Sequence, residues 1–449
     1  MKLFDLRAIG SHAATIWIGQ LAVMAFAVTD TLVAGQYDPQ ALATLSIATA
    51  LYVSISIGLQ GYVQGLLPIW GRLYGQGATR ALGDSVRQAL YALAICSTLG
   101  VLLLWLSPAL LQLTEVPAHL HQPVSHYLAI QAITLPMSML VRAFNTFSQS
   151  IGQPRWVARL QAGALLCKIP LTIWLSFGGW GMPELGLAGC AWATCITHIG
   201  LLLVICWLLR RHPLYQPYRL LQRPPRPDWA TQRQFLALGL PSSIAIWVEV
   251  TSFTALSLLM APMGETASAA QQIASTTAAL LYMWPLSLAI AGSARVSYWQ
   301  GRQQAASAHR AQRSTLLLTL ASASLFALLL ALLRQPMASL YVQDAAVQQT
   351  AASLLLIVAA YHLADAFQVC GLFLLRCYHV VRLPTLIYSV MLWGLGLGGG
   401  YWLAWHGPPA WRGPHALWIM VALAMTLVAG LFLWLLQRVS RPVAGQPDH

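Results

Sequence analysis

Apolar runs of about 20 residues recur along almost the whole chain, separated by short polar stretches. A run of this length matches the helix that is needed to cross the hydrocarbon core of a bilayer. The runs lack the period-two alternation that a membrane barrel requires. The pattern predicts an all-α integral membrane protein with twelve transmembrane helices, near residues 12–35, 41–66, 86–112, 123–147, 156–178, 185–209, 235–260, 268–292, 313–333, 347–376, 383–404 and 416–437.

The longest polar interruption, from Arg210 to Gln234, is rich in proline and arginine and separates two halves of six predicted helices. A shift of about 226 residues places ALATLSIA (41–48) over ASAAQQIA (267–274). Because each half has six spans, both enter the membrane from the same side, which indicates parallel repeats with a substrate site near the midplane between them. The predicted domains are an N-terminal lobe (1–209), a cytoplasmic linker (210–234), a C-terminal lobe (235–437) and a cytoplasmic tail (438–449).

Composition supports a membrane protein, since 58% of the 449 residues are hydrophobic and 8% are charged. The net charge of +13 raises the question of a nucleic-acid partner. About 22 of the 25 Lys and Arg residues, however, lie at the N-terminus, in loops after even-numbered helices or in the tail, and only Arg334 and Arg412 lie in loops after odd-numbered helices. This asymmetry predicts cytoplasmic termini and a lipid bilayer, with no nucleic acid, as the partner.

Three acids fall inside the predicted spans, Asp30, Glu249 and Asp365, and one basic residue, Lys168, lies in the middle of a span rather than near its end. A charge at the bilayer centre costs about 2.5–3.5 kcal/mol on insertion scales, so such residues are seldom retained without a function. The structural alternative is a fixed salt bridge, or a protonated carboxyl that only joins helices. Because one base cannot pair with three acids, the pattern favours an ion or substrate pathway.

The acids do not recur in the repeat. The 226-residue shift aligns Glu249 with Val23, and it aligns Asp365 and Asp30 with apolar residues as well. Residues that hold each six-helix unit together would be expected in both halves. The pattern therefore predicts a cation site in one lobe and a distinct polar site in the other.

Oxygen-bearing side chains accompany the acids of the second half. Tyr361, Asp365 and Gln368 follow the i, i+4, i+7 spacing of one helix face. Phenol, carboxylate and amide oxygens suit a hard monovalent cation. His362 points about 100° away on this helix and is expected to pack between helices.

Aromatic residues are interleaved with the polar face around Glu249, which also carries Ser242 and Ser252. Aromatic faces bind flat organic cations, although contact with lipid is the commoner role of any one such residue. The candidates to line a substrate cleft are Trp247, Phe253, Gln272, Trp284 and Gln368.

Several segments together resemble the multidrug and toxic compound extrusion (MATE) family, in its NorM-like branch. The similarity covers essentially the whole chain and rests on the order and spacing of its motifs. These are VTDTLVAG in the first predicted helix, GRLYGQG after the second, PSSIAIWVEV in the seventh, YMWPLSLAIAGSARVSYWQGR across the eighth and YHLADAF in the tenth. The resemblance implies a bacterial inner-membrane antiporter that exports small cationic drugs by alternating access of two six-helix lobes.

The resemblance also implies roles for particular residues. It associates Glu249, Asp365 and Tyr361 with the coupling cation, for which the NorM-like pattern favours Na⁺ at Glu249 and Asp365. It associates Asp30 with substrate or proton handling in the first lobe. Such pumps commonly have asparagines in helix 5, whereas this chain has Lys168 there. A cation-only site in the first lobe is therefore in doubt.

The chain contains no Walker-type G-x-x-x-x-G-K-[ST] loop, and we expect a monomer without cofactor or enzymatic activity. An inward Na⁺ or H⁺ and an outward drug cation cannot both be neutralised by the same few carboxylates, so binding of one favours release of the other. The membrane potential contributes about 2.3 kcal/mol per 100 mV to each inward charge, which is enough to drive export. Carboxylates with a phenol serve Na⁺ and H⁺ equally, so both ions stay open.

Two other functions stay open at this stage. A lipid-linked precursor flippase of the same superfamily would need cationic residues around a pyrophosphate, and among these intramembrane charges only Lys168 is basic. A membrane-embedded enzyme or haem protein would need paired histidines or a nucleophile motif, and His198 and His362 have no obvious partners.

Asp30 and Lys168 lie roughly 18 and 12 residues from the cytoplasmic starts of the first and fifth predicted helices. At a rise of 1.5 Å per residue their depths differ by about 10 Å, and a long lysine stem can cover much of that gap. We predict that Lys168 is the counter-ion of Asp30 if these two helices are neighbours. If they are not, Lys168 faces headgroups or a water-filled cleft alone.

Overall fold

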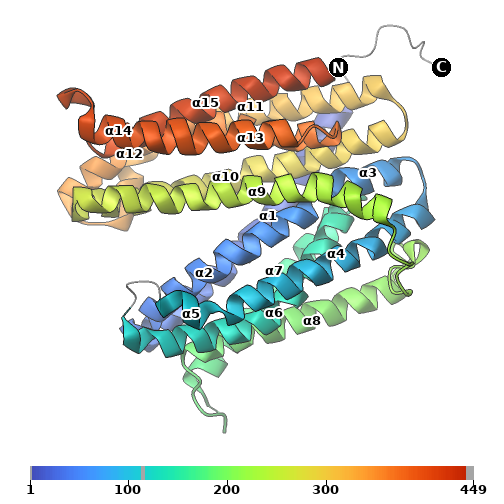
Figure 1. The fold of residues 1–449 in the computed structure, drawn as a ribbon, viewed down its shortest axis with the longest axis horizontal. Helices are drawn as coiled ribbons and strands as arrows, with labels where there is room; N and C mark the ends of the chain where they lie inside the picture. Colours follow the sequence, from blue (N-terminus) through green and yellow to red (C-terminus); the bar gives the residue numbers. More distant parts are fainter. Residues whose placement is uncertain (1–2, 113–116, 180, 441–449) are drawn as a thin grey trace. The chain divides into compact units, whose positions relative to one another are not determined.

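A computed structural model of the chain describes residues 3–112, 117–179 and 181–440 and is helical throughout these ranges, apart from short connections (Figure 1). Most of the predicted tail, 441–449, lies outside the described residues. Twelve helical segments of the described chain are long and apolar enough to cross a membrane, which confirms the predicted all-α membrane fold.

The first half contains α1 (Leu3–Tyr37), α2 (Pro39–Gln64), α3 (Leu67–Gly75), α4 (Thr79–Trp105), α5 (Ser107–Gln112), α6 (Ala118–Ser150), α7 (Pro154–Phe177) and α8 (Leu187–Arg211). The second half contains α9 (Trp229–Met260), α10 (Glu265–Gly301), α11 (Ala305–Tyr341), α12 (Ala345–Cys377), α13 (Arg382–Val390), the π-helical segment η3 (Met391–Gly398), α14 (Gly399–His406) and α15 (Pro414–Val439). Short 3-10 turns η1 (Gln216–Tyr218), η2 (Ala261–Met263) and η4 (Pro409–Trp411) join some of them.

Most helices extend beyond the apolar runs that predict them. The run at 313–333, for example, lies within α11, which spans Ala305–Tyr341. An apolar run marks the part of a helix inside the hydrocarbon, whereas the helix itself continues into the polar interface wherever its residues still favour it. Hydropathy therefore locates these helices well and underestimates their length.

Two of the twelve spans are interrupted. One breaks between α2 and α3 at Gly65, where a Cβ atom would lie 2.9 Å from the Cα of Gly239, so that only glycine allows this close approach of two backbones. The other contains η3, whose sequence MLWGLGLG is rich in glycine. A π-helical turn is a common local adjustment in such a helix.

Helix starts confirm the internal repeat. α1 starts at Leu3 and α9 at Trp229, α2 at Pro39 and α10 at Glu265, and α4 at Thr79 and α11 at Ala305, in each case 226 residues apart. The corresponding separations are 227 residues for α6 and α12, 228 for α7 and α13, and 227 for α8 and α15. The two halves thus share one order and spacing of six spans, as parallel repeats require.

The described contacts divide the chain into two compact units, Thr15–Ser243 and Met1–Ala14 with Ile244–His449. Their boundaries fall inside α1 and α9, the first helix of each repeat. The unit Thr15–Ser243 thus includes the connection between the halves, while the first 14 residues belong with the second half. The lobes 1–209 and 235–437, with the linker 210–234, stay a prediction of the sequence.

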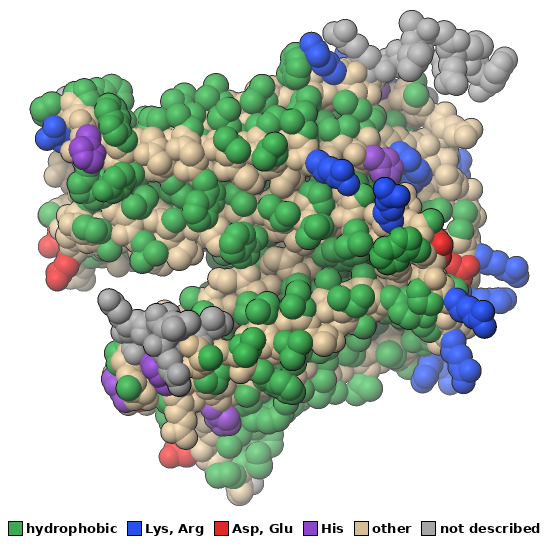
Figure 2. Space-filling view, in the orientation of Figure 1, with side chains coloured by type: hydrophobic (Ala, Val, Ile, Leu, Met, Phe, Trp, Pro, Cys, Tyr) green, Lys and Arg blue, Asp and Glu red, His purple; other side chains and the backbone are tan. Residues whose placement is uncertain are grey.

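The connection after α8 packs on the first-half helices. Tyr91 of α4 donates a hydrogen bond to the carbonyl of Pro225 (3.1 Å), and Gln88 donates to that of Arg226 (2.6 Å). Asp228 accepts the backbone N–H of Thr231 at the start of α9 (3.0 Å), and hydrogen bonds from Thr231 hold the pKa of the exposed Asp228 below its ordinary value. In the unit Thr15–Ser243, Figure 2 shows Lys and Arg side chains gathered at the end that carries this connection.

Candidate functional site

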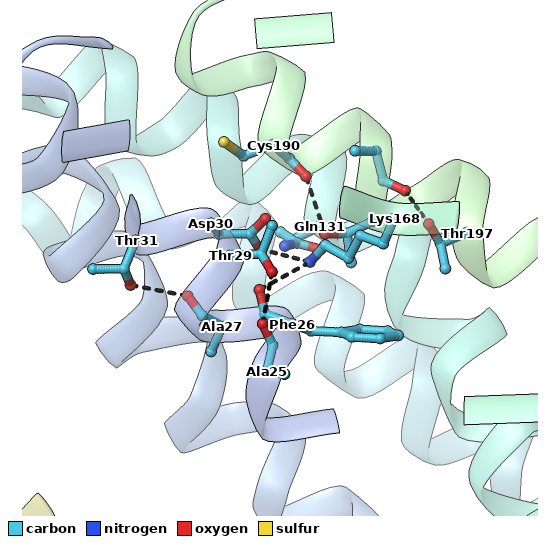
Figure 3. Close-up of polar contacts among 12 residues, drawn as sticks. Ala25, Phe26, Ala27, Thr29, Asp30, Thr31, Gln131, Lys168, Cys190 and Thr197 are labelled. Carbon is cyan, nitrogen blue, oxygen red and sulfur yellow. Dashed lines mark hydrogen bonds and ion pairs between the residues drawn. The ribbon is translucent and has the colours of Figure 1, made fainter. Parts of the chain in front are cut away.

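An ion pair joins α1 and α7 within the unit Thr15–Ser243, which we call the first-half unit (Figure 3). The Nζ of Lys168 is 2.8 Å from Oδ2 of Asp30, and the two residues are only 1% and 7% exposed. The helices approach closely because their contact includes small residues: a Cβ atom at Gly19 would lie 3.5 Å from the Cα of Ala158. The sequence predicts that Lys168 is the counter-ion of Asp30 if the first and fifth spans are neighbours, and the structure contains this contact.

The lysine has further contacts with α1. Its ammonium lies 3.4 Å from the carbonyl oxygen of Phe26 and 4.9 Å from the centroid of the Phe26 ring. A cation is attracted to both the carbonyl oxygen and the aromatic face. These contacts, together with Asp30, surround the lysine head with partners from α1.

Several polar atoms near this ion pair lack a hydrogen-bond partner among the described residues. They are Oδ1 of Asp30, Oε1 of Gln131 and, one turn along α7 from Lys168, Oγ1 of Thr172. Gln131 uses its amide nitrogen to donate to the hydroxyl of Tyr127 (3.1 Å). A buried polar group without a partner is costly, so this cluster is suited to a further hydrogen-bonding guest.

The acids of the second half have phenols, not a lysine, as partners. The hydroxyl of Tyr282 on α10 donates to Oε2 of Glu249 on α9 (3.3 Å). On α12, the hydroxyl of Tyr361 donates to Oδ1 of the buried Asp365 (3.2 Å). Asp365 lies within electrostatic range of Glu249. Three helices therefore contribute two carboxylates and two phenols to one region.

An aromatic group adjoins these acids. The rings of Phe253, Tyr361 and Trp418 contact one another edge to face, with centroids 5.5–6.3 Å apart. The indole N–H of Trp418 donates to Oε1 of Gln271 (2.7 Å). Sequence reasoning names Phe253 and Tyr361 but misses Trp418 and Gln271, because nothing in the pattern distinguishes a buried tryptophan of α15 from one that faces lipid.

The remaining predicted lining residues are scattered. Trp247 is 50% exposed, Gln272 is exposed, and Trp284 packs edge to face on Phe326 at 6.2 Å. Gln368 is buried, and its Oε1 has no hydrogen-bond partner among the described residues. Of these residues only Gln368 adds an uncommitted oxygen donor to the face that carries Tyr361 and Asp365.

The serines near Glu249 do not extend its site. Ser242 donates to the carbonyl of Leu238 (2.7 Å) and Ser252 to that of Val248 (2.6 Å), each on its own helix. These are the local bonds that serines commonly make inside membrane helices.

His198 and His362, which the sequence offers as possible haem or enzyme residues, each contact a neighbouring group. His198 interacts through Nδ1 with the carbonyl of Thr194 (2.9 Å), and His362 packs beside Phe326. Within the described ranges, no three residues among His, Cys, Asp and Glu come together as a metal-binding group.

Arg376 is a further buried charge, which the sequence pattern hides. It is the last residue of the predicted span 347–376, where a basic residue is expected to face the cytoplasm. In the structure it is only 1% exposed within α12. Tyr388 of α13 is also fully buried and lies within electrostatic range of Glu249 and Asp365. The signal available in the sequence is the spacing of 11 residues, about three helical turns, from Asp365 to Arg376.

Comparisons with known proteins agree with this architecture. The MatE family model matches residues 16–174 and 241–402. The probable multidrug resistance protein NorM of Aromatoleum aromaticum is 32% identical over 437 residues, which cover 96% of this chain and 93% of that protein. Multidrug resistance protein PmpM of Pseudomonas aeruginosa is 32% identical over 449 residues, which cover 99% and 94%.

Solved structures are similar in fold. The Vibrio cholerae MATE transporter VcmN in its bent form has a TM-score of 0.85 at 16% identity and covers 97% of each chain. The eukaryotic MATE transporter AtDTX14 has a TM-score of 0.85 at 18% identity and covers 98% of each chain.

Proposed function

We propose, from the premise that this chain belongs to the MatE family of membrane transporters, that it exports hydrophobic organic cations in exchange for inward Na⁺ or H⁺. Relatives named as multidrug resistance proteins support export of several small molecules. The observation that carries the coupling is the pair of acids Glu249 and Asp365, which lie within electrostatic range of each other among oxygen donors.

The coupling cation is proposed to bind at Glu249 and Asp365 with help from Tyr361. Carboxylate, phenol and amide oxygens form a donor set for a hard cation, and the free Oε1 of Gln368 adds one more oxygen nearby. Neutralising two neighbouring carboxylates relieves their mutual repulsion, so a bound cation stabilises the site.

Exchange follows from competition for these charges. Substrate and coupling ion are both cationic, and each binds less well while the other neutralises the acids. With two alternating access states, the inward ion then favours release of the drug outside. A membrane potential of 100 mV contributes about 2.3 kcal/mol per inward charge, equivalent to more than a tenfold concentration ratio.

The first-half unit is proposed to serve the substrate or a proton. Lys168 is the resident counter-ion of Asp30, and a cationic drug or a proton would replace its ammonium. The uncommitted Oδ1 of Asp30 offers such a guest a first hydrogen-bond acceptor. This pairing also weakens the flippase alternative, because a lysine engaged by a carboxylate is a poor receptor for pyrophosphate.

The chain is a multi-pass membrane protein. We propose that it acts as a monomer, and its bacterial NorM relatives support a place in the inner membrane. We propose cytoplasmic termini because basic residues concentrate in the loops after even-numbered spans.

The test is ethidium efflux from cells or inverted vesicles with Na⁺ and pH gradients imposed separately. We expect efflux to require an ion gradient, and Na⁺ to accelerate drug release at fixed pH. If the efflux rate is unchanged over a wide range of Na⁺ concentrations but depends strictly on the pH gradient, the protein is a proton antiporter. Efflux that needs neither gradient would contradict the proposal.

A further inference from the structure

Arg376 is a buried cation to which the coupling mechanism above gives no role. It lies in the last turn of α12, a helix that packs against α10, α11 and α15. Its exposed fraction is 1%, and its Nε, Nη1 and Nη2 atoms all lack a hydrogen-bond partner among the described residues. Its one described contact is with the ring of Phe373, 4.3 Å from the guanidinium carbon.

An arginine in this position is costly unless a negative charge compensates it. Removing a guanidinium from water costs several kcal/mol, and a single aromatic face returns about 2 kcal/mol at most. The described residues of this region offer two negative charges, Glu249 and Asp365. Arg376 lies within electrostatic range of Glu249 but forms no ion pair with it among the described contacts.

Helix geometry brings the arginine towards the same region. Asp365 and Arg376 are 11 residues apart, which corresponds to about three turns and nearly the same face of α12. Side chains on a helix lean towards its N-terminus, so the long arginine stem points back in the direction of Asp365. Other ionisable groups near the acids are the phenols of Tyr282, Tyr361 and Tyr388 and the thiol of Cys370.

We propose that Arg376 is the internal counter-charge of the carboxylate pair and that it limits the second-half site to one monovalent cation in each transport cycle. This inference rests on the proposed function, in which Glu249 and Asp365 bind the coupling ion. Two carboxylates and one guanidinium leave a single negative charge, which one Na⁺ or one H⁺ neutralises. Without the guanidinium, two cations are needed for the same neutrality.

In the drug-free protein Asp30 is neutralised by Lys168 at 2.8 Å, so bound ²²Na⁺ reports on Glu249 and Asp365. A proton taken up at Asp30 adds the same amount to the wild type and to every Arg376 variant, so the difference between these proteins reports on the second-half site. The stoichiometry is therefore measurable on the whole chain, without separating the two halves.

The experiment counts monovalent cations bound by the purified protein, as ²²Na⁺ at equilibrium together with proton uptake followed by a pH indicator. We expect one cation per wild-type chain, two for Arg376→Gln and one for Arg376→Lys, which keeps the charge. The first cation should bind at least about tenfold more tightly to Arg376→Gln, because the variant lacks a positive charge that repels it in an environment with an effective dielectric constant of about 20. An unchanged count and affinity in Arg376→Gln would overturn the proposal.

A second pair of variants decides the question if Arg376→Gln does not fold. Glu249→Gln alone leaves Asp365 balanced by Arg376 and should bind no cation. The double variant Glu249→Gln with Arg376→Gln leaves Asp365 unbalanced and should regain one. Equal counts in these two proteins would also reject the role of Arg376.

The outcome separates this inference from the proposed function. If the wild-type chain binds no cation that depends on Asp365, the coupling site itself is misassigned. If it binds one such cation and every Arg376 variant does the same, the coupling site stands and only the counter-charge role fails.

Discussion

The buried acid of the first half contacts a lysine directly, whereas Glu249 and Asp365 of the second half have phenols as their hydrogen-bond partners among the described residues. Asp30 lies 2.8 Å from Lys168, but Glu249 and Asp365 accept hydrogen bonds from tyrosines at 3.3 and 3.2 Å. The nearby Arg376 stays outside direct contact with any described acid. An intramembrane carboxylate thus has a cationic partner in the first half and phenol partners in the second, although the two halves are repeats of one another.

This difference distinguishes a site that is neutral by itself from a site that requires a cation. A buried ion pair has no net charge, so no further cation is required to neutralise it, whereas removing one partner leaves an uncompensated buried charge. Phenols stabilise a carboxylate by hydrogen bonding but supply no charge. The comparison therefore supports ion coupling in the second half and substrate handling in the first.

The largest effect should come from removing charge in the second half. We expect Glu249→Gln and Asp365→Asn each to abolish ion-coupled export while the protein remains folded, because each keeps the shape and polarity of the side chain. Ethidium efflux and drug resistance measure this, with Glu265→Gln, at an exposed acid of α10, as the matched control. Full resistance with wild-type ion dependence in either variant would show that the coupling site lies elsewhere.

Breaking the first-half pair should mainly affect stability. Lys168→Ala leaves Asp30 buried without its counter-charge, which we expect to destabilise the protein by about 3–5 kcal/mol. Thermal unfolding in detergent and the amount of protein in the membrane report this loss. The double variant Lys168→Ala with Asp30→Asn should recover most of it, whereas simply additive effects in the double-mutant cycle would disprove the pairing.

The phenols should affect ion binding in one half only. Tyr282→Phe and Tyr361→Phe each remove a phenol oxygen that lies beside a carboxylate and is available to a bound cation. We therefore expect each to weaken Na⁺ binding by about tenfold, or about 1.4 kcal/mol. Tyr127→Phe removes a buried phenol of the first half and should leave Na⁺ binding unchanged. Equal effects of all three changes would remove the distinction between the halves.

The smallest effect concerns an ion pair that is less deeply buried. Arg295 lies 3.1 Å from Asp5, with side chains 29% and 15% exposed. Because water screens this pair, a double-mutant cycle with Asp5→Asn and Arg295→Gln should give a coupling energy of about 0.2–1 kcal/mol. The same cycle on Asp30 and Lys168 should give a clearly larger value, and a similar value would mean that burial does not strengthen the first-half pair.

Much of the second-half site follows from local sequence. Tyr361, Asp365 and Gln368 belong to one helix, so helical spacing alone predicts that they share a face, and the bond from Tyr361 to Asp365 follows that spacing. The bond from Tyr282 to Glu249 joins two helices, and no spacing along the chain predicts it. Arg376 is the last residue of a predicted span, and position along a span does not reveal which side of the helix is buried.

The sequence by itself determined that twelve helices cross the membrane, that they form two parallel repeats and that three acids and one mid-span lysine lie inside the spans. These features depend on hydropathy, periodicity and spacing, which are local properties of the chain. Only the tertiary structure decided which helices are neighbours, and with them the contact of Lys168 with Asp30 and the burial of Arg376. Lipid and a packed helix are equally apolar environments, so the pattern of a membrane helix does not record which of its faces meets a partner.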